Sequence, residues 1–133
     1  MANEAVIIEL LGNGGDPIRY TVADGTTIPK GSLMQITGDR TITISAGGSN
    51  KFVGIAAAEK VANDGSTNLA VYTNGIFDLK CTAAAITLGF RTRINGINLI
   101  EAGVDADYES GRNVGQALET ASADEVIAVR ILL

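Results

Sequence analysis

Three carboxylates alternate along residues 105–109 and form the nearest approach to a metal-binding pattern in the chain: Asp105, Asp107 and Glu109. Alternate carboxylates on one loop can present their oxygens to a hard cation such as Ca²⁺. A calcium loop, however, carries glycine at its sixth position and a bidentate glutamate at its twelfth. Here Gly111 is at the seventh position and Gln116 at the twelfth. The pattern favours an exposed, solvated loop over residues 102–113, with a cation site at the three carboxylates as the alternative.

Two other features could in principle support chemistry. Residues 11–16 (Leu-Gly-Asn-Gly-Gly-Asp) follow an expected strand as a phosphate-binding loop would, but they lack the Gly-Lys-Ser/Thr ending and precede another strand. They predict a hairpin loop. Cys81 has no His to activate it, since the chain contains none, so we expect a small buried apolar side chain.

The composition excludes several classes of protein. The 133 residues include no His, no Trp and one Cys, which rules out His-based catalysis, His-ligated zinc and an intramolecular disulfide. Fifteen Asp and Glu against ten Lys and Arg give a net charge of −5, which disfavours nucleic-acid binding. We find no signal-peptide pattern and no membrane-spanning run. The sequence predicts a protein of the cytoplasm or of an assembly, without cofactor and without enzymatic activity.

Short apolar blocks rich in β-branched residues, separated by glycine-bearing turns, indicate many short strands. We expect strands over residues 5–11, 18–22, 33–36, 41–45, 52–56, 69–73, 76–79, 90–94, 98–101, 114–118 and 126–132. Asn74-Gly75 has the strongest hairpin signal. Residues 1–133 are therefore expected to form one compact, all-β, antiparallel barrel or sandwich-like domain with at most one or two short helical turns.

An internal echo suggests that this domain consists of two related β-units of about half the chain each. Residues 53–56 (Val-Gly-Ile-Ala) recur as residues 114–117 (Val-Gly-Gln-Ala). Upstream, Gly31 precedes Gly54 by 23 positions, and Gly89 precedes Gly115 by 26. Chance similarity between two glycine- and alanine-rich β-sequences is the alternative explanation.

Two groups of residues are candidates for contacts with a partner. The N-terminal residues 1–19 could provide a buried central strand or an arm that extends the sheet of a neighbouring chain. The relevant apolar residues are Ala5, Val6, Ile7 and Ile8. Arg91 and Arg93 are the only clustered basic residues, with no aromatic platform expected beside them, and we expect them to form ion pairs across a subunit contact.

Much of the chain after residue 23 resembles the small capsid decoration, or cement, proteins of tailed bacteriophages. The matching segments are residues 24–33 (Asp-Gly-Thr-Thr-Ile-Pro-Lys-Gly-Ser-Leu), 52–56 (Phe-Val-Gly-Ile-Ala), 69–79 (Leu-Ala-Val-Tyr-Thr-Asn-Gly-Ile-Phe-Asp-Leu) and 114–117 (Val-Gly-Gln-Ala). The motifs are structural, and residues before Tyr20 match no family pattern.

The resemblance implies a barrel-like homotrimer on the outer surface of the virion, made in the host cytoplasm. Its partner would be the major capsid protein, met at three-fold and quasi-three-fold positions after the shell expands. There it would clamp neighbouring capsomers and stabilise the head. The resemblance implies no nucleic-acid or membrane partner. Another phage structural or cell-surface β-module, such as a tail, fibre or receptor-binding domain, is the alternative.

Overall fold

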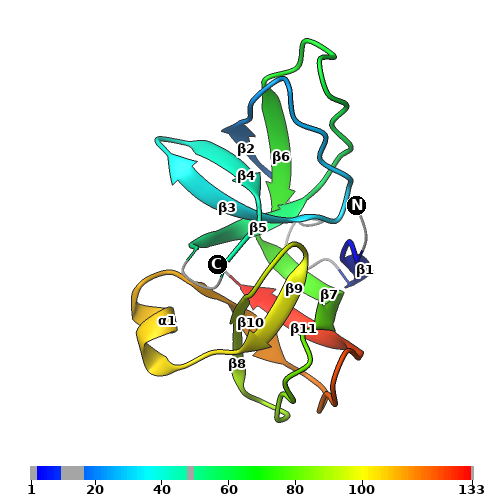
Figure 1. Cartoon of the computed structure of the whole chain (residues 1–133), viewed down its shortest axis with the longest axis vertical. Coiled ribbons are helices and arrows are strands. Elements are labelled where there is room, and N and C mark those ends of the chain that lie inside the picture. Colours follow the sequence, from blue (N-terminus) through cyan, green and yellow to red (C-terminus); the bar gives the residue numbers. More distant parts are fainter. Residues whose placement is uncertain (1–2, 10–16, 48–49, 133) are drawn as a thin grey trace.

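The computed structural model describes residues 3–9, 17–47 and 50–132, which contain eleven β-strands and one short helix (Figure 1). The elements are β1 (Val6–Glu9), β2 (Ile18–Thr21), β3 (Leu33–Gly38), β4 (Thr41–Ile44), β5 (Phe52–Ala56), β6 (Asn68–Tyr72), β7 (Asn74–Cys81), β8 (Arg91–Ile94), β9 (Leu99–Ala102), α1 (Asp105–Glu109), β10 (Asn113–Ala117) and β11 (Val126–Leu132). The predicted all-β class is confirmed, and each predicted strand overlaps an observed one.

The strands form two closed five-stranded barrels, one after the other along the chain. The first barrel has the order β2-β4-β3-β5-β6, and the second has the order β7-β11-β10-β8-β9, closed by the pairing of β7 with β9. In each barrel the first and third strands are parallel. The other four pairings are antiparallel and join equivalent strands. This shared topology supports the predicted pair of related β-units.

The correspondence between the barrels extends to single hydrogen bonds. Gly31 N donates to Ala56 O at 2.9 Å in the first barrel, and Gly89 N donates to Ala117 O at 2.9 Å in the second. Further positions are matched by their strand register, isolated bridges and loop hydrogen bonds. The matched pairs are Ile28 and Ile86, Gly54 and Gly115, Lys60 and Ala121, Val71 and Val129, and Tyr72 and Arg130. The same backbone arrangement has therefore been built twice from different side chains.

The repeated Val-Gly-x-Ala motif has a backbone cause. A Cβ atom on Gly54 would lie 2.5 Å from Tyr72 O, and the φ of Gly54 is 147°, where side-chain-bearing residues are rare. A Cβ atom on Gly115 would collide with Arg130 O in the equivalent place on the adjacent strand. Glycine at these two positions lets the neighbouring strand approach closely and close each barrel.

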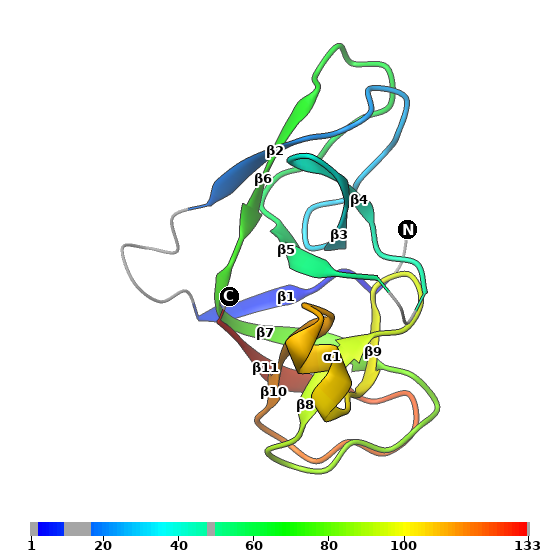
Figure 2. The same ribbon diagram turned by 90° about the vertical axis from the view of Figure 1, so that its left-hand side faces the viewer.

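The two barrels are joined by a shared apolar core. The larger core cluster combines second-barrel residues such as Phe77 and Ile100 with Leu33, Phe52 and Ile55 of the first barrel. A smaller cluster fills the first barrel alone. Figure 2 shows the barrels stacked one above the other, with β5 of the upper barrel facing the lower one. The barrels therefore pack directly against one another.

A buried polar contact fixes the same junction. The side chain of Asn98, in the turn between β8 and β9, accepts a hydrogen bond from Leu33 N at 2.9 Å. Asn98 N in turn donates to Ser45 Oγ at 3.0 Å. Because Asn98 and Ser45 are both buried, these bonds satisfy polar groups that would otherwise lose their contact with water.

The N-terminal strand β1 is an outer strand and bridges the two barrels. It pairs antiparallel with β7 of the second barrel, and Ala5 N donates to Gly31 O of the first at 2.6 Å. Figures 1 and 2 both place β1 at the level where the barrels meet. Val6 and Ile8 are 57% and 54% exposed. A buried central strand, one of the two sequence-based alternatives, is therefore wrong, because β1 has β7 as its single partner among the described strands.

Three finer expectations need correction or fall outside the described ranges. Asn74-Gly75 does not form a hairpin: both residues belong to β7, and the chain passes there from the first barrel to the second. Residues 102–113 are not wholly an exposed loop, because they contain α1 and bury Asp107. The predicted loop at residues 11–16 lies outside the described residues, and the strands on either side of it pair in different sheets.

Candidate functional site

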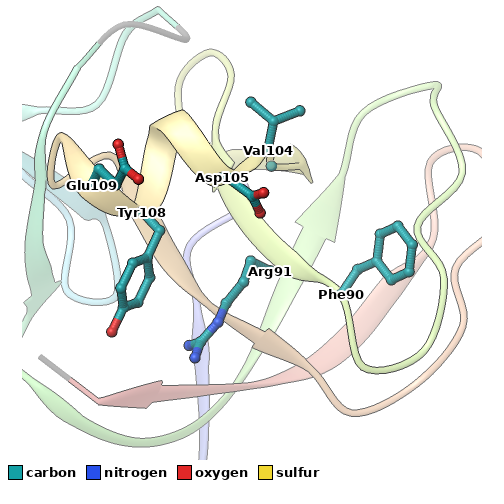
Figure 3. A pocket seen from close by; sticks show the side chains of 7 residues that line it. Phe90, Arg91, Val104, Asp105, Tyr108 and Glu109 are labelled. Atoms are coloured by element: carbon teal, nitrogen blue, oxygen red, sulfur yellow. The ribbon is translucent and has the colours of Figure 1, made fainter.

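A recess with a volume of about 550 Å³ lies beside α1. Its lining comes from the start of β8 and from the connection between β9 and β10 (Figure 3). The lining residues are Phe90, Arg91, Gly103, Val104, Asp105, Tyr108 and Glu109. The recess thus combines apolar and aromatic side chains with charges of both signs.

A buried carboxylate holds α1 in place. The side chain of Asp107 is 1% exposed and accepts a hydrogen bond from Val104 N at 2.9 Å, at the beginning of the helix. Arg112 donates to the same carboxylate at 2.9 Å, and Arg93 approaches it at 3.3 Å. Arg93 also forms an ion pair with Glu101, its cross-strand partner on β9. The cluster therefore fixes the connection against β8 and β9.

These bonds determine the ionisation of Asp107. Burial works against the charged carboxylate and would raise its pKa. The hydrogen bond from Val104 N and the two arginines outweigh that effect, so the pKa of Asp107 lies below its ordinary value. Asp107 is accordingly a charged residue with a structural task.

Within the recess, Arg91 lies over the ring of Tyr108, with its guanidinium carbon 5.0 Å from the ring centroid. This is a cation–π contact. Figure 3 shows the two side chains next to one another, with Phe90 at the far side of the recess. Asp105 and Glu109 form no ion pair with any residue that the structure describes. They are one helical turn apart, at positions i and i+4 of α1.

The alternating carboxylates do not converge on a cation. Asp107 turns inward to Arg93 and Arg112, whereas Asp105 and Glu109 line the recess. Over the described residues, no group of three His, Cys, Asp or Glu side chains could hold a metal ion. The helix causes this separation, because residues two positions apart project from different faces of a helix whereas those four apart share one.

Both arginines have partners within the chain. Arg93 forms ion pairs with Glu101 and Asp107, and its expected ion pairs across a subunit contact stay a prediction. Arg91 does have an aromatic neighbour, since Tyr108 lies beneath it. The spacing of Asp105, Tyr108 and Glu109, at i, i+3 and i+4, is a helical signal that could have placed these three side chains on one helix face, but it gives no sign of the contact with Arg91.

Cys81 is buried in the shared core, as predicted. Burial, with a smaller contribution from Glu125, raises the pKa of its thiol to about 11. A thiol that remains protonated at neutral pH is a poor nucleophile. Cys81 therefore has a packing role.

Sequence reasoning missed a second charge cluster, at the outer end of the first barrel. The ammonium group of Lys60 is buried and donates to Asp24 Oδ1 at 3.1 Å, to Asp64 Oδ1 at 2.8 Å and to the carbonyl oxygens of Asp24 and Val61 at 3.0 Å. Both aspartates belong to Asp-Gly pairs, which indicated turns but gave no sign of a common partner.

The Lys60 cluster shifts two pKa values. Burial alone would lower the pKa of Lys60, but the hydrogen bonds to Asp64 and Asp24 outweigh it and raise that pKa. The bond from Lys60, aided by Ser66 N, lowers the pKa of Asp64 to about 2. The cluster thus remains charged at neutral pH and joins two turns that are about forty residues apart.

No helix in the described part of the chain is long and apolar enough to cross a membrane. Comparison with known protein families and with curated proteins finds no match for this chain.

Proposed function

We propose that this chain is a structural virion protein that binds the outside of the expanded capsid of a tailed bacteriophage. It acts as a homotrimer at three-fold and quasi-three-fold positions and clamps neighbouring capsomers. It is made in the host cytoplasm, and its partner is the major capsid protein. The proposal begins from the sequence resemblance to capsid decoration proteins.

The observation that carries the proposal is the position of the resembling segments in the fold. Residues 53–56 lie in β5 and residues 114–117 in β10, equivalent strands of two closed barrels. The Val-Gly-x-Ala motif therefore occupies the same structural position in both units, which makes a chance similarity between its two copies a weaker explanation. Two barrels with a shared core form a stiff scaffold, which suits a clamp that must transmit force between capsomers.

The surface is also compatible with a binding role. Val6 and Ile8 on β1, together with Phe90, Val104 and Tyr108 around the recess, are all more than half exposed. Exposed apolar side chains are typical of interaction surfaces where they gather in one place, as Phe90, Val104 and Tyr108 do around the recess. A trimer would engage several capsid sites at once, so individually weak contacts would add to a strong attachment.

The proposal is tested by co-sedimentation with heads of the phage that carries the gene, prepared without decoration protein. We expect the purified chain to sediment with expanded heads and not with unexpanded ones, and to saturate at a multiple of three copies per face. Sedimentation equilibrium of the free chain shows whether the trimer forms before attachment. Failure to sediment with expanded heads would overturn the proposal.

A further inference from the structure

The recess beside α1 is lined in part by a helix that has no counterpart in the described part of the first barrel, although both barrels share one backbone plan. The chain between Gly89 and Gly115 is three residues longer than that between Gly31 and Gly54, and the longer segment contains α1. Two walls of the recess, Val104 and Tyr108, come from this connection. The recess is therefore an addition to the repeated unit and is not required by its topology.

The apolar rim of the recess is likewise not required by the fold. Leu88 and Phe90, just before β8, are exposed. Their counterparts in the first barrel, on either side of Gly31, are Lys30 and Ser32. Lys30 is exposed and charged, and Ser32 is buried. The first barrel closes without an exposed aromatic side chain at this place, so stability does not explain the exposure of Phe90.

The charges in the recess select the kind of side chain that fits it. The guanidinium of Arg91 stacks on the face of the Tyr108 ring, whereas Asp105 and Glu109 have no ion-pair partner among the described residues. The lining therefore carries one positive and two negative charges beside Phe90 and Val104. A basic side chain next to an aliphatic one is complementary to such a surface in charge and in polarity.

We propose that this recess is a docking pocket for a segment of a partner protein that presents a Lys or Arg beside an aliphatic residue. The inference rests on the proposed function in naming the capsid protein as that partner. Asp105 and Glu109 receive the cation, and Phe90 with Val104 packs against the aliphatic neighbour. Asp107 is a positioning residue, because it holds α1 through Val104 N, Arg93 and Arg112 and does not face the recess.

The first test uses short peptides as probes of the recess alone. The ¹⁵N-labelled full chain is titrated with Ac-Leu-Lys-Leu-NH₂, Ac-Leu-Gln-Leu-NH₂ and Ac-Leu-Glu-Leu-NH₂, and backbone amide shifts are followed by NMR. We expect shifts at residues 90–91 and 103–109, with the Lys peptide bound about fivefold more tightly than the Glu peptide. Equal affinities, or shifts elsewhere on the chain, would overturn the inference.

Variants separate charge recognition from general effects. Asp105→Asn/Glu109→Gln should abolish the preference for the Lys peptide. Asp39→Asn/Asp124→Asn, which changes the net charge equally at two exposed turns, should retain it. Phe90→Ser introduces the residue type that the first barrel has at the equivalent position, Ser32. This variant should bind all three peptides more weakly and to the same extent.

The second test uses undecorated, expanded heads. Asp105→Asn/Glu109→Gln should bind them about tenfold more weakly, whereas the Asp39→Asn/Asp124→Asn control should bind as the wild type does. If the wild type binds heads and both double variants bind equally well, the docking inference fails and the proposed function stands. If the wild type binds the Lys peptide preferentially at the recess but does not bind heads, the proposed function fails and the assignment of the recess as a docking pocket stands.

Two other occupants would contradict the inference. Loss of self-association in Asp105→Asn/Glu109→Gln, measured by sedimentation equilibrium, would make the recess a contact between copies of this chain. Shifts of its amides by N-acetylglucosamine, without a response to any peptide, would make it a sugar site.

Discussion

The first and second barrels share all five strand pairings, yet charged side chains stabilise them in different places. In the first barrel, Lys60 forms an isolated β-bridge with Ile28, and its ammonium group forms ion pairs with Asp24 and Asp64 in two separate turns. In the second barrel, Ala121 occupies the position of Lys60 in the bridge. The charged cluster of the second barrel lies instead around Asp107 of α1, where Arg93 and Arg112 form ion pairs with its carboxylate.

This difference separates the residues that the shared barrel topology requires from the side chains that are particular to one barrel. Both barrels need glycine where a neighbouring strand carbonyl approaches, at Gly54 and Gly115. Neither needs a particular set of ion pairs, since each copy uses its own. The recess beside α1 belongs to the second barrel, where the connection between β9 and β10 forms part of its lining.

The largest expected effect comes from the shared glycines. Gly54→Ala and Gly115→Ala should each lower the free energy of unfolding by about 3 kcal/mol or more, because the added Cβ meets a backbone carbonyl that cannot move without opening the barrel. Urea unfolding measures this loss. Gly25→Ala is the control, because the nearest atom to its Cβ would be Asn63 Oδ1 at 3.8 Å. Equal stability of all three variants would refute the requirement for glycine at positions 54 and 115.

A smaller effect, confined to one barrel, is expected from the Lys60 cluster. Lys60→Met should lower the melting temperature by several degrees, because Asp24 and Asp64 lose the ammonium that joins their turns. Hydrogen exchange should accelerate at the outer end of the first barrel and not in the second. Uniform acceleration across both barrels would contradict the local role of the cluster.

The same cluster predicts a dependence on pH. The pKa of Asp64 falls from 3.8 to about 2 on folding, so its contribution to stability is complete above pH 4 and is lost as the pH falls towards 2. The stability difference between wild type and Lys60→Met should therefore be constant at neutral pH and shrink between pH 4 and pH 2. Equilibrium unfolding at a series of pH values measures it, and a constant difference would disprove the assignment.

The bridge that β1 makes between the barrels can be broken at Gly31. Its φ is 91°, and a Cβ there would lie 2.5 Å from Ala5 O. Gly31→Ala should cost about 2 kcal/mol and detach β1 while both barrels stay closed. Limited proteolysis should then cut the N-terminal segment first. Cleavage first within a barrel would show that β1 is not the element that Gly31 holds.

The smallest effect is expected at the connection between β9 and β10 of the second barrel, which contains α1. Asp107→Asn keeps the shape of the side chain but weakens its bonds to Arg93 and Arg112, at a cost of about 1 kcal/mol because both arginines are partly exposed. Amide exchange should rise in α1 and remain unchanged in the first barrel. Exchange that rises equally in the connection between β4 and β5 would contradict the separation of the two barrels.

The strands could be predicted from the sequence because their signals are local. β-branched blocks and glycine turns predicted all eleven, and the Val-Gly-x-Ala echo indicated the duplication. Closure of each half into its own barrel was not predictable, because it depends on the parallel pairings of β2 with β4 and of β7 with β9. The pairing partner of a strand is set by distant residues and leaves no local signal.

The same reason explains the error at Asn74-Gly75 and the omission of the recess. The Asn-Gly pair is typical of a tight hairpin, but here the chain continues extended because β7 pairs with β11 from Asn74 to Lys80. Tyr108 and Arg91 are 17 positions apart and meet because Asp107 binds α1 against β8. The three carboxylates were visible in the sequence, whereas their division between an interior and a surface role required the helix.

The central claim, that this chain reinforces a phage head, is tested most directly by calorimetry of expanded, undecorated heads with and without the purified chain. The account predicts that the melting temperature of the heads rises as the chain is added and stops rising once its sites are filled. A melting temperature that stays constant while the chain is bound would contradict the account.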